Sequence, residues 1–355
     1  MNLELLILSF FTSFFIVLFS TPALIKVAIM KGLIGEPDEE RKLHKRKTPS
    51  IGGIIIFAGA IFTYSLWFPG QSPHNLKYVV AGGLLLFFVG VKDDIIGTAP
   101  VKKLIAHVLV GLMLIMMADV RITSLYGLFG IREIPEWASV FLSLYAYIVV
   151  VNSINLIDGV DGLATGVGVI SSFAFGIWFY LAGDIEMAML AISLGGALFA
   201  FMFFNFSPAR IFMGDSGSLT LGFIFSLLAI KMVEFKVAYL PTELMSVSKP
   251  ILALSILAYP LIDTLRIFIY RSFRGISPFA ADKNHIHHRL LDIGLSQKQT
   301  VLAIYLFSVF IIILAFMTQK LDATWAFVTV AGFALLIAQI PFFFKKVKNK
   351  ASLVS

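Results

Sequence analysis

Long apolar segments recur along almost the whole chain, and they constrain the fold more than any other feature of the sequence. A hydrocarbon core of about 30 Å is crossed by a helix of about 20 apolar residues, because lipid offers no partner to unpaired backbone groups. We therefore expect an all-α polytopic membrane protein with about 11 transmembrane helices. Ten is the alternative count, since the third and eighth segments are short. The segments lie at residues 4–26, 51–68, 78–91, 102–118, 136–152, 162–181, 186–205, 217–233, 249–270, 300–318 and 323–344.

Composition leads to the same class of protein. Hydrophobic residues make up 59% of the 355 residues, charged residues make up 14%, and the mean hydropathy is +0.92, which excludes an ordinary water-soluble globule. We expect the first segment to be retained rather than cleaved, because it is longer than 20 residues and opens with Glu4. The chain has no cysteine, so disulfides and thiolate metal sites are excluded. We expect one integral membrane domain over residues 1–355.

The net charge of +7 is explained better by orientation in a membrane than by nucleic-acid binding. If the N-terminus lies outside and eleven segments cross, 21 of the 28 Lys and Arg residues lie on one side and 7 on the other. The basic side is the cytoplasmic side by the positive-inside rule. We therefore predict an outside N-terminus, a cytoplasmic C-terminus and no nucleic-acid partner.

Polar residues gather in the loops on this predicted cytoplasmic side. Carboxylates at a membrane boundary are costly and usually face a water-filled cavity or a cation. We therefore predict that loops 27–50, 92–101, 153–161, 206–216 and 271–299 form one active site. The first supplies cations and is followed by SIGG; the others carry KDDIIGT at 92–98, NSINLIDGVDG at 152–162, ARIFMGDSGS at 209–218 and ADKNHIHHRL at 281–290.

Five aspartates in these loops predict a site for a divalent cation and phosphate. So dense a cluster needs a cation to offset its charge, and oxygen ligands with room for water and phosphate suit Mg²⁺. Glycines beside the acids let backbone N–H groups approach phosphate, although Asp94, Asp158 or Asp215 taken alone is as readily a helix cap. Lys102 and Lys103 can balance phosphate charge or simply extend toward lipid headgroups. The five are Asp93, Asp94, Asp158, Asp161 and Asp215.

In residues 152–162, Asn and Asp recur every three positions, a spacing that drifts by about 60° per step on a helix. Gly159 and Gly162 also oppose a continuous helix. We expect the helix to unwind into a loop there, with Asn155 and one aspartate directed at the same point.

The chain places half of its six histidines in one loop, as His285, His287 and His288 beside Arg289. A zinc site is weakly supported, because His-x-His-His lacks the helical i, i+4 spacing and has no cysteine partner. Imidazole and guanidinium donors suit a phosphate or a sugar better, and a solvated loop is the remaining alternative.

Asp263 lies inside the ninth apolar segment, with Arg266 three residues further on. Either the two form an ion pair that shields both charges in lipid, or they have a functional role.

The succession VKDDIIG, NSINLIDGVDGLATG, FMGDSGS and HIHHRL resembles the polyprenyl-phosphate N-acetylhexosamine-1-phosphate transferases of glycosyltransferase family 4. The similarity runs from TPSIGG at 48–53 to the histidine loop. The family includes the phospho-MurNAc-pentapeptide translocase, the dolichyl-phosphate GlcNAc-1-phosphate transferase, and the initiators of O-antigen, enterobacterial common antigen and teichoic acid synthesis. The chain is most similar to the undecaprenyl-phosphate GlcNAc-1-phosphate transferases.

The resemblance implies a reaction at the cytoplasmic face of the bacterial inner (plasma) membrane, with Mg²⁺ as cofactor and Mn²⁺ as the alternative. The phosphate of undecaprenyl phosphate attacks the β-phosphorus of a UDP-sugar and UMP is released. The family's triple histidine for MurNAc-pentapeptide is replaced by HIHHRL, which favours UDP-GlcNAc; MurNAc-pentapeptide and another UDP-HexNAc remain alternatives. A homodimer is compatible with the sequence.

The resemblance also implies roles for individual residues. Asp93 matches the base that acts on the lipid phosphate, and Asp94 and Asp158 are assigned with it to catalysis. Asp215 matches the main metal ligand and Asn155 a second one. Substrate binding falls to Phe212 and Asp161 at the uracil, to Lys102 and Lys103 near phosphate, and to His285, His287, His288 and Arg289 at the sugar phosphate.

Two functions of other classes compete with this interpretation. A secondary transporter would use Asp263 and Arg266, but its site should lie near the bilayer midplane between repeated halves, and the sequence shows no repeat. A scaffold protein would not need four ordered polar motifs.

Overall fold

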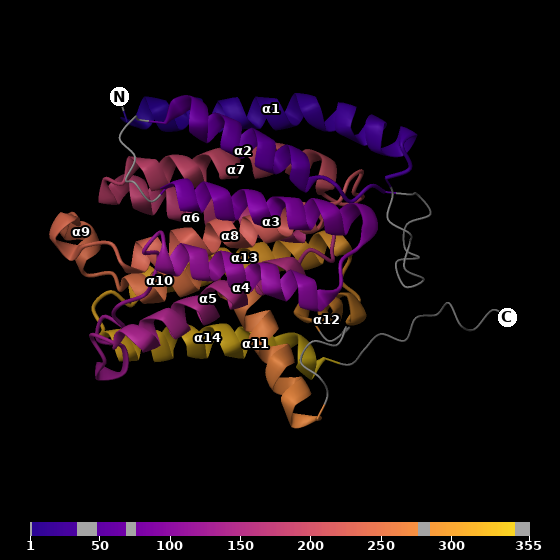
Figure 1. Cartoon of the computed structure of the whole chain (residues 1–355). Coiled ribbons are helices and arrows are strands. Elements are labelled where there is room, and N and C mark those ends of the chain that lie inside the picture. Colours follow the sequence, from indigo (N-terminus) through magenta and orange to yellow (C-terminus); the bar gives the residue numbers. More distant parts are fainter. Residues whose placement is uncertain (1, 34–47, 69–75, 276–284, 345–355) are drawn as a thin grey trace.

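The structure, a computed structural model, describes residues 2–33, 48–68, 76–275 and 285–344. The regular secondary structure within them is helical, apart from one isolated bridge between Ser124 and Glu133, and loops join the helices. Each predicted apolar segment contains one helix, or in the ninth case a bent pair (Figure 1). The long helices are α1 (Asn2–Met30), α2 (Gly53–Trp67), α3 (Leu76–Ile96), α4 (Pro100–Met116), α5 (Glu136–Leu156), α6 (Leu163–Ala182), α7 (Ile185–Asn205), α8 (Gly214–Val233), α10 (Lys249–Ile256), α11 (Ala258–Phe273), α13 (Gln297–Met317) and α14 (Ala323–Phe343). Shorter elements are η2 (Leu128–Gly130), η3 (Val237–Tyr239), α9 (Thr242–Met245) and α12 (Ile286–Asp292).

Seven helices of the described residues are long and apolar enough to cross a membrane, namely α1, α5, α6, α7, α8, α13 and α14; α10 and α11 make an eighth if they are one broken span. The chain is therefore a multi-pass membrane protein, while the count of eleven and the orientation stay predictions. The helices of the third and eighth segments, α3 with 21 residues and α8 with 20, extend beyond the predicted apolar runs, and only α8 of the two is among these seven.

The ninth segment, predicted as one transmembrane helix over 249–270, is a pair of helices rather than one continuous helix. Its two helices, α10 and α11, are bent by 78° at Leu257. The sequence contains the cause, since Pro260 has no N–H to donate and its ring would clash with the carbonyl of Ile256 in an unbroken helix. Proline is tolerated where it stands, in the first turn of α11.

The core lies around α7 and α8. Helices α1, α2 and α6 pack on α7, and α3 and α5 pack on α8. Glycines permit close approach, since a Cβ on Gly222 of α8 would lie 2.6 Å from Cα of Val151 on α5. Large apolar side chains such as Phe19, Leu306 and Leu336 are exposed on the outer helices, as expected of surfaces that face lipid.

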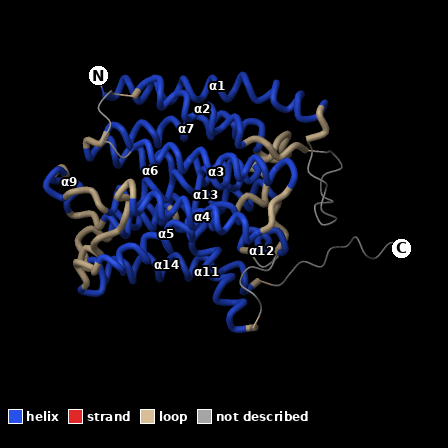
Figure 2. Tube along the Cα trace, in the orientation of Figure 1, coloured by secondary structure: helices blue, strands red, loops and turns tan. Residues whose placement is uncertain are grey.

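The predicted active-site loops contain more helix than we expected. Residues 92–96 end α3, 153–156 end α5, 214–216 begin α8, and α12 lies within 271–299. Parts of two loops, 34–47 and 276–284, lie outside the described residues. Helix α12 lies at one end of the bundle, opposite the end with the N-terminus and α9, as Figure 2 also shows.

Candidate active site

The N-terminus of α8 is the centre of the polar cluster. Asp158 accepts a hydrogen bond from the N–H of Gly214 at 3.1 Å, and Asp94 accepts from the N–H groups of Asp215 at 2.6 Å and Ser216 at 3.0 Å. The first N–H groups of a helix have no partner within it, and negative charge is favourable there. Asp94 and Asp158 therefore attach the start of α8 to α3 and to the loop after α5.

Glycines bring three backbones together at this point. A Cβ on Gly90 of α3 would lie 2.5 Å from Cα of Ser216, and one on Gly53 of α2 would lie 1.9 Å from the nitrogen of Gly217. Both distances are far below van der Waals contact, so only glycine fits. Gly214 has a φ of +73°, which a side chain rarely adopts. The glycines of SIGG and GDSGS thus shape the site through packing.

Lys103 bridges two of the predicted acids. Its Nζ lies 2.8 Å from Oδ2 of Asp93 and 2.5 Å from Oδ2 of Asp215. Asn155 donates through Nδ2 to Oδ1 of Asp215 at 3.1 Å and to Oγ of Ser218 at 2.8 Å. The cluster draws these side chains from α3, α4, α5 and α8, so it exists only when the four helices pack together.

The oxygen atoms of this cluster suit a divalent cation. Asp93 and Asp215 direct oxygens at one point that already holds a positive charge, the ammonium of Lys103, and carboxylate oxygens are the ligands that Mg²⁺ prefers. Asn155 here orients Asp215 through its Nδ2, and it would ligate a cation only through Oδ1. The metal roles of Asp215 and Asn155 stay predictions.

The residues predicted to hold uracil lie in tightly connected loops. Asp161 is buried and accepts from the N–H of Ala209 at 3.0 Å. Phe212 is partly exposed; its N–H donates to the carbonyl of Pro49 at 2.8 Å, and its carbonyl accepts from the N–H of Gly52 at 3.0 Å. The segment TPSIGG is thus joined to FMGD, and the ring of Phe212 remains partly accessible at their junction.

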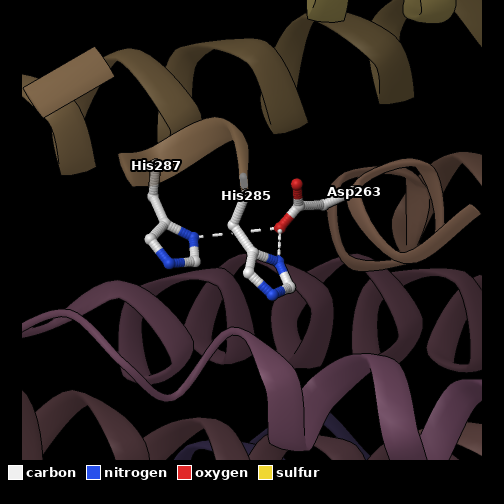
Figure 3. A group of neighbouring side chains, drawn as sticks. All are labelled: Asp263, His285 and His287. Atoms are coloured by element: carbon white, nitrogen blue, oxygen red, sulfur yellow. Dashed lines mark hydrogen bonds and ion pairs between the residues drawn. The ribbon is translucent and has the colours of Figure 1, made fainter. Parts of the chain in front are cut away.

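The histidines lie beside this cluster. His285 precedes α12, and its Nδ1 lies 2.8 Å from Oδ2 of Asp263 (Figure 3). Nε2 of His287 lies 3.9 Å from the point that a Cβ on Gly159 would occupy, next to Asp158. Burial lowers the pKa of His287 to about 3, against the opposite effect of the Asp263 carboxylate, so this ring is neutral at physiological pH.

The same histidines form a group that could hold a metal. Their ring nitrogens and the Asp263 carboxylate lie within 4.8 Å of one another. However, Asp263 already accepts from His285 and from the N–H of Ile286, and Nδ1 of His287 lies 3.2 Å from the hydroxyl of Tyr259. A hydrogen-bonded network therefore accounts for the group as it stands.

The remaining predicted residues differ in position. Lys102 is exposed, in contrast to Lys103. His288 packs its ring against His287, with centroids 4.5 Å apart. Arg289 donates to the carbonyls of Pro341 at 3.3 Å and Phe344 at 2.7 Å, so its described contacts attach α12 to the end of α14.

Two members of the site, Ser218 and Tyr259, were not predicted from the sequence. Ser218 stands in GDSGS, one turn after Asp215, so helical spacing could have indicated it. Tyr259 lies in an apolar run with no distinguishing neighbour, and no sequence signal marks it.

Fold and site together define a multi-pass helical membrane protein with an acid-lined, lysine-bridged polar site at one end of its bundle. The sequence profile of glycosyl transferase family 4 matches residues 76–233, which contain this cluster. The chain belongs to that family, because relatives at 30% identity or more extend over most of its length. The resemblance stated from the motifs is thereby confirmed.

Three relatives illustrate the similarity. The chain is 31% identical over 341 residues to the probable undecaprenyl-phosphate N-acetylglucosaminyl 1-phosphate transferase of Bacillus subtilis. The aligned residues cover 94% of this chain and 90% of the relative. The chain is 30% identical over 315 residues to the undecaprenyl-phosphate alpha-N-acetylglucosaminyl 1-phosphate transferase of Yersinia pestis, covering 87% and 83%. The Salmonella typhi enzyme of the same name is 31% identical over 308 residues, covering 85% and 80%.

Proposed function

We propose that the protein transfers N-acetylglucosamine-1-phosphate from UDP-GlcNAc to undecaprenyl phosphate, releasing UMP and forming a lipid diphosphate-linked sugar. The names of the relatives support this reaction. The observation that carries it is the convergence of Asp93 and Asp215 on Lys103. A site at the helix ends suits a soluble nucleotide and a membrane-bound phosphate, which must meet at the membrane surface.

In this proposal an oxygen of the lipid phosphate forms a bond to the β-phosphorus of UDP-GlcNAc. The bond from that phosphorus to the bridging oxygen breaks, and its electron pair leaves with UMP. Asp93 takes any proton left on the lipid phosphate, and Lys103 offsets charge on the phosphates. One diphosphate is broken and another is made, so catalysis rests on positioning and charge neutralisation.

A Mg²⁺ ion, with Mn²⁺ as the alternative, would be held by Asp215 and Asn155 and would neutralise diphosphate charge. Asp94 and Asp158 keep the start of α8, and with it Asp215, in place. Phe212 and Asp161 bind the uracil, Lys102 contributes to phosphate attraction, and the loop with His285, His287, His288 and Arg289 binds the sugar phosphate. The site faces the cytoplasm of a bacterial inner membrane.

The test uses purified protein in detergent with undecaprenyl phosphate and, separately, UDP-GlcNAc, UDP-GalNAc or UDP-MurNAc-pentapeptide. We expect UMP release and a GlcNAc-diphosphate lipid from UDP-GlcNAc, loss of both with EDTA, and recovery with Mg²⁺. Radioactive UMP should exchange into UDP-GlcNAc, because the step is reversible. Transfer of MurNAc-pentapeptide phosphate alone would reassign the substrate. Solute uptake into vesicles without UMP release would indicate a transporter.

A further inference from the structure

Asp263 lies in α11, just beyond the bend, and its side chain is only 1% exposed. Both carboxylate oxygens are engaged by the histidine segment. Oδ1 accepts from the N–H of Ile286 at 2.8 Å, and Oδ2 lies 2.8 Å from Nδ1 of His285 and 3.8 Å from Nδ1 of His287 (Figure 3). A buried carboxylate is costly unless it is paired and hydrogen-bonded, so this arrangement is a specific one.

The contacts of Asp263 determine the protonation pattern of His285. An ionised carboxylate can only accept hydrogen bonds, so Nδ1 of His285 must carry the hydrogen. A neutral imidazole with its hydrogen on Nδ1 has its lone pair on Nε2, which here lies on the edge away from Asp263. A carboxylate that is hydrogen-bonded to one ring nitrogen of a functional histidine fixes the tautomer and the orientation of that ring in this way.

Asp263 also holds the start of α12. Ile286 is the first residue of this helix, and its N–H has no partner within the helix, so the carboxylate acts as a cap supplied by another helix. The ring of His287 stacks on that of His285, with centroids 5.2 Å apart and planes 11° apart. The orientation of one imidazole therefore restricts the other.

Within this pair, His287 lies on the side of the acid cluster. Nε2 of His287 lies 3.9 Å from the position that a Cβ on Gly159 would occupy, and the adjacent Asp158 accepts from the N–H of Gly214, the residue before Asp215. The histidine pair held by Asp263 therefore lies close to the loop that holds the start of α8. The guanidinium of Arg266, on the same helix as Asp263, lies over the ring of Phe342.

We propose that Asp263 is a positioning residue, which holds His285 in its Nδ1-protonated tautomer and fixes α12 so that the histidine pair presents Nε2 to the sugar diphosphate beside Asp158. His285 then accepts a hydrogen bond from an N–H or O–H group of the N-acetyl sugar. This inference rests on the proposed function of the site. The buried acid then positions the substrate through contacts with His285 and Ile286 that form only in the folded protein.

The test is Asp263→Asn. The asparagine oxygen can still accept from Ile286, but its NH₂ group faces Nδ1 of His285 and requires the opposite tautomer. We expect kcat/KM for UDP-GlcNAc to fall by about ten- to hundredfold, whereas the Kd of UMP, which lacks the sugar, and the KM of undecaprenyl phosphate change by less than about twofold. Asp322→Asn is the matched control, because Asp322 caps α14 by accepting from the N–H groups of Thr324 and Trp325; its kcat/KM should be unchanged.

A second measurement is independent of turnover. Nitrogen-15 NMR of histidine-labelled protein, with the His285 signals identified by their loss in His285→Gln, should show Nδ1 protonated in the wild type and Nε2 protonated in Asp263→Asn. A wild-type His285 protonated on Nε2 alone would overturn the proposal even if the enzyme proves inactive on UDP-GlcNAc. The proposal would also be overturned if kcat/KM for UDP-GlcNAc were unchanged in Asp263→Asn, or if the affinity for UMP fell as much as kcat/KM. One zinc ion bound per wild-type chain and absent from Asp263→Asn would overturn it as well.

Discussion

The carboxylate of Asp94 on α3 accepts a 2.6 Å hydrogen bond from the backbone N–H of Asp215, the second residue of α8. Both acids were predicted to belong to one site, Asp94 as a catalytic residue and Asp215 as the main metal ligand. In the structure one of them holds the backbone that carries the other, and Asp94 also accepts from the N–H of Ser216. The position of Asp215, and of any cation that it binds, therefore depends on Asp94.

Asp94→Asn should destabilise the protein as well as reduce activity. The amide keeps one acceptor oxygen, so one N–H at the start of α8 loses its partner, at a cost of about 1–3 kcal/mol. We expect a lower apparent unfolding temperature in detergent, measured by tryptophan fluorescence. Asp119→Asn is the control, because Asp119 is 72% exposed and pairs only with Arg121 among the contacts described for it. Wild-type thermal stability combined with inactivity would mean that Asp94 acts on substrate instead.

Lys103 and Lys102 should differ sharply although they are adjacent. Lys103→Met removes two charge-assisted hydrogen bonds, each contributing about 1.5–3 kcal/mol, so UMP release should fall by at least about a hundredfold. Lys102→Met, at an exposed position, removes only a solvent-screened attraction for phosphate and should lower the rate by no more than about fivefold. Equal losses in the two variants would show that general positive charge matters, rather than the bridge between Asp93 and Asp215.

Gly214→Ala should inactivate the enzyme, and Gly97→Ala should not. Both glycines have a φ of +73°, so each alanine carries a strain of about 1–2 kcal/mol. A Cβ on Gly214 would lie 2.1 Å from the carbonyl oxygen of Ser50 and 2.6 Å from Oδ1 of Asp94, whereas one on Gly97 would meet nothing within 4 Å. Activity and thermal stability are the measurements. If both variants lose activity equally, backbone strain and not close packing governs the site.

The predicted orientation can be tested with single thiols, because the chain has no cysteine. Ala99→Cys, between α3 and α4, should be labelled by a membrane-impermeant reagent only from the cytoplasm. Lys320→Cys, between α13 and α14, should be labelled only from outside. Both positions are exposed, so access depends on sidedness alone. Labelling of Ala99→Cys from outside intact cells would place the acid cluster on the wrong side for a cytoplasmic nucleotide.

The helices and the composition of the site could be predicted from the sequence, because both depend on local patterns. Apolar segments of about 20 residues predict helices in lipid wherever they occur. Glycines after Leu156 predicted the end of α5. Asn155 and Asp158 both bind the first turn of α8, Asn155 through the Asp215 side chain and Asp158 through the Gly214 backbone. Pro260 also marked the bend in the ninth segment, although we expected a continuous helix there.

The partner of each polar side chain was decided only by tertiary structure. Nothing in the sequence distinguishes Lys103 from Lys102, which differ by a rotation of about 100° around one helix. Likewise, Arg266 was the nearest candidate partner of Asp263 in sequence. In the structure the Asp263 carboxylate is hydrogen-bonded to His285 and Ile286, 22 and 23 residues away. Periodicity describes which face of a helix is apolar, whereas these contacts depend on how helices distant in sequence pack, and glycine-sized gaps and the bend at Leu257 set that packing.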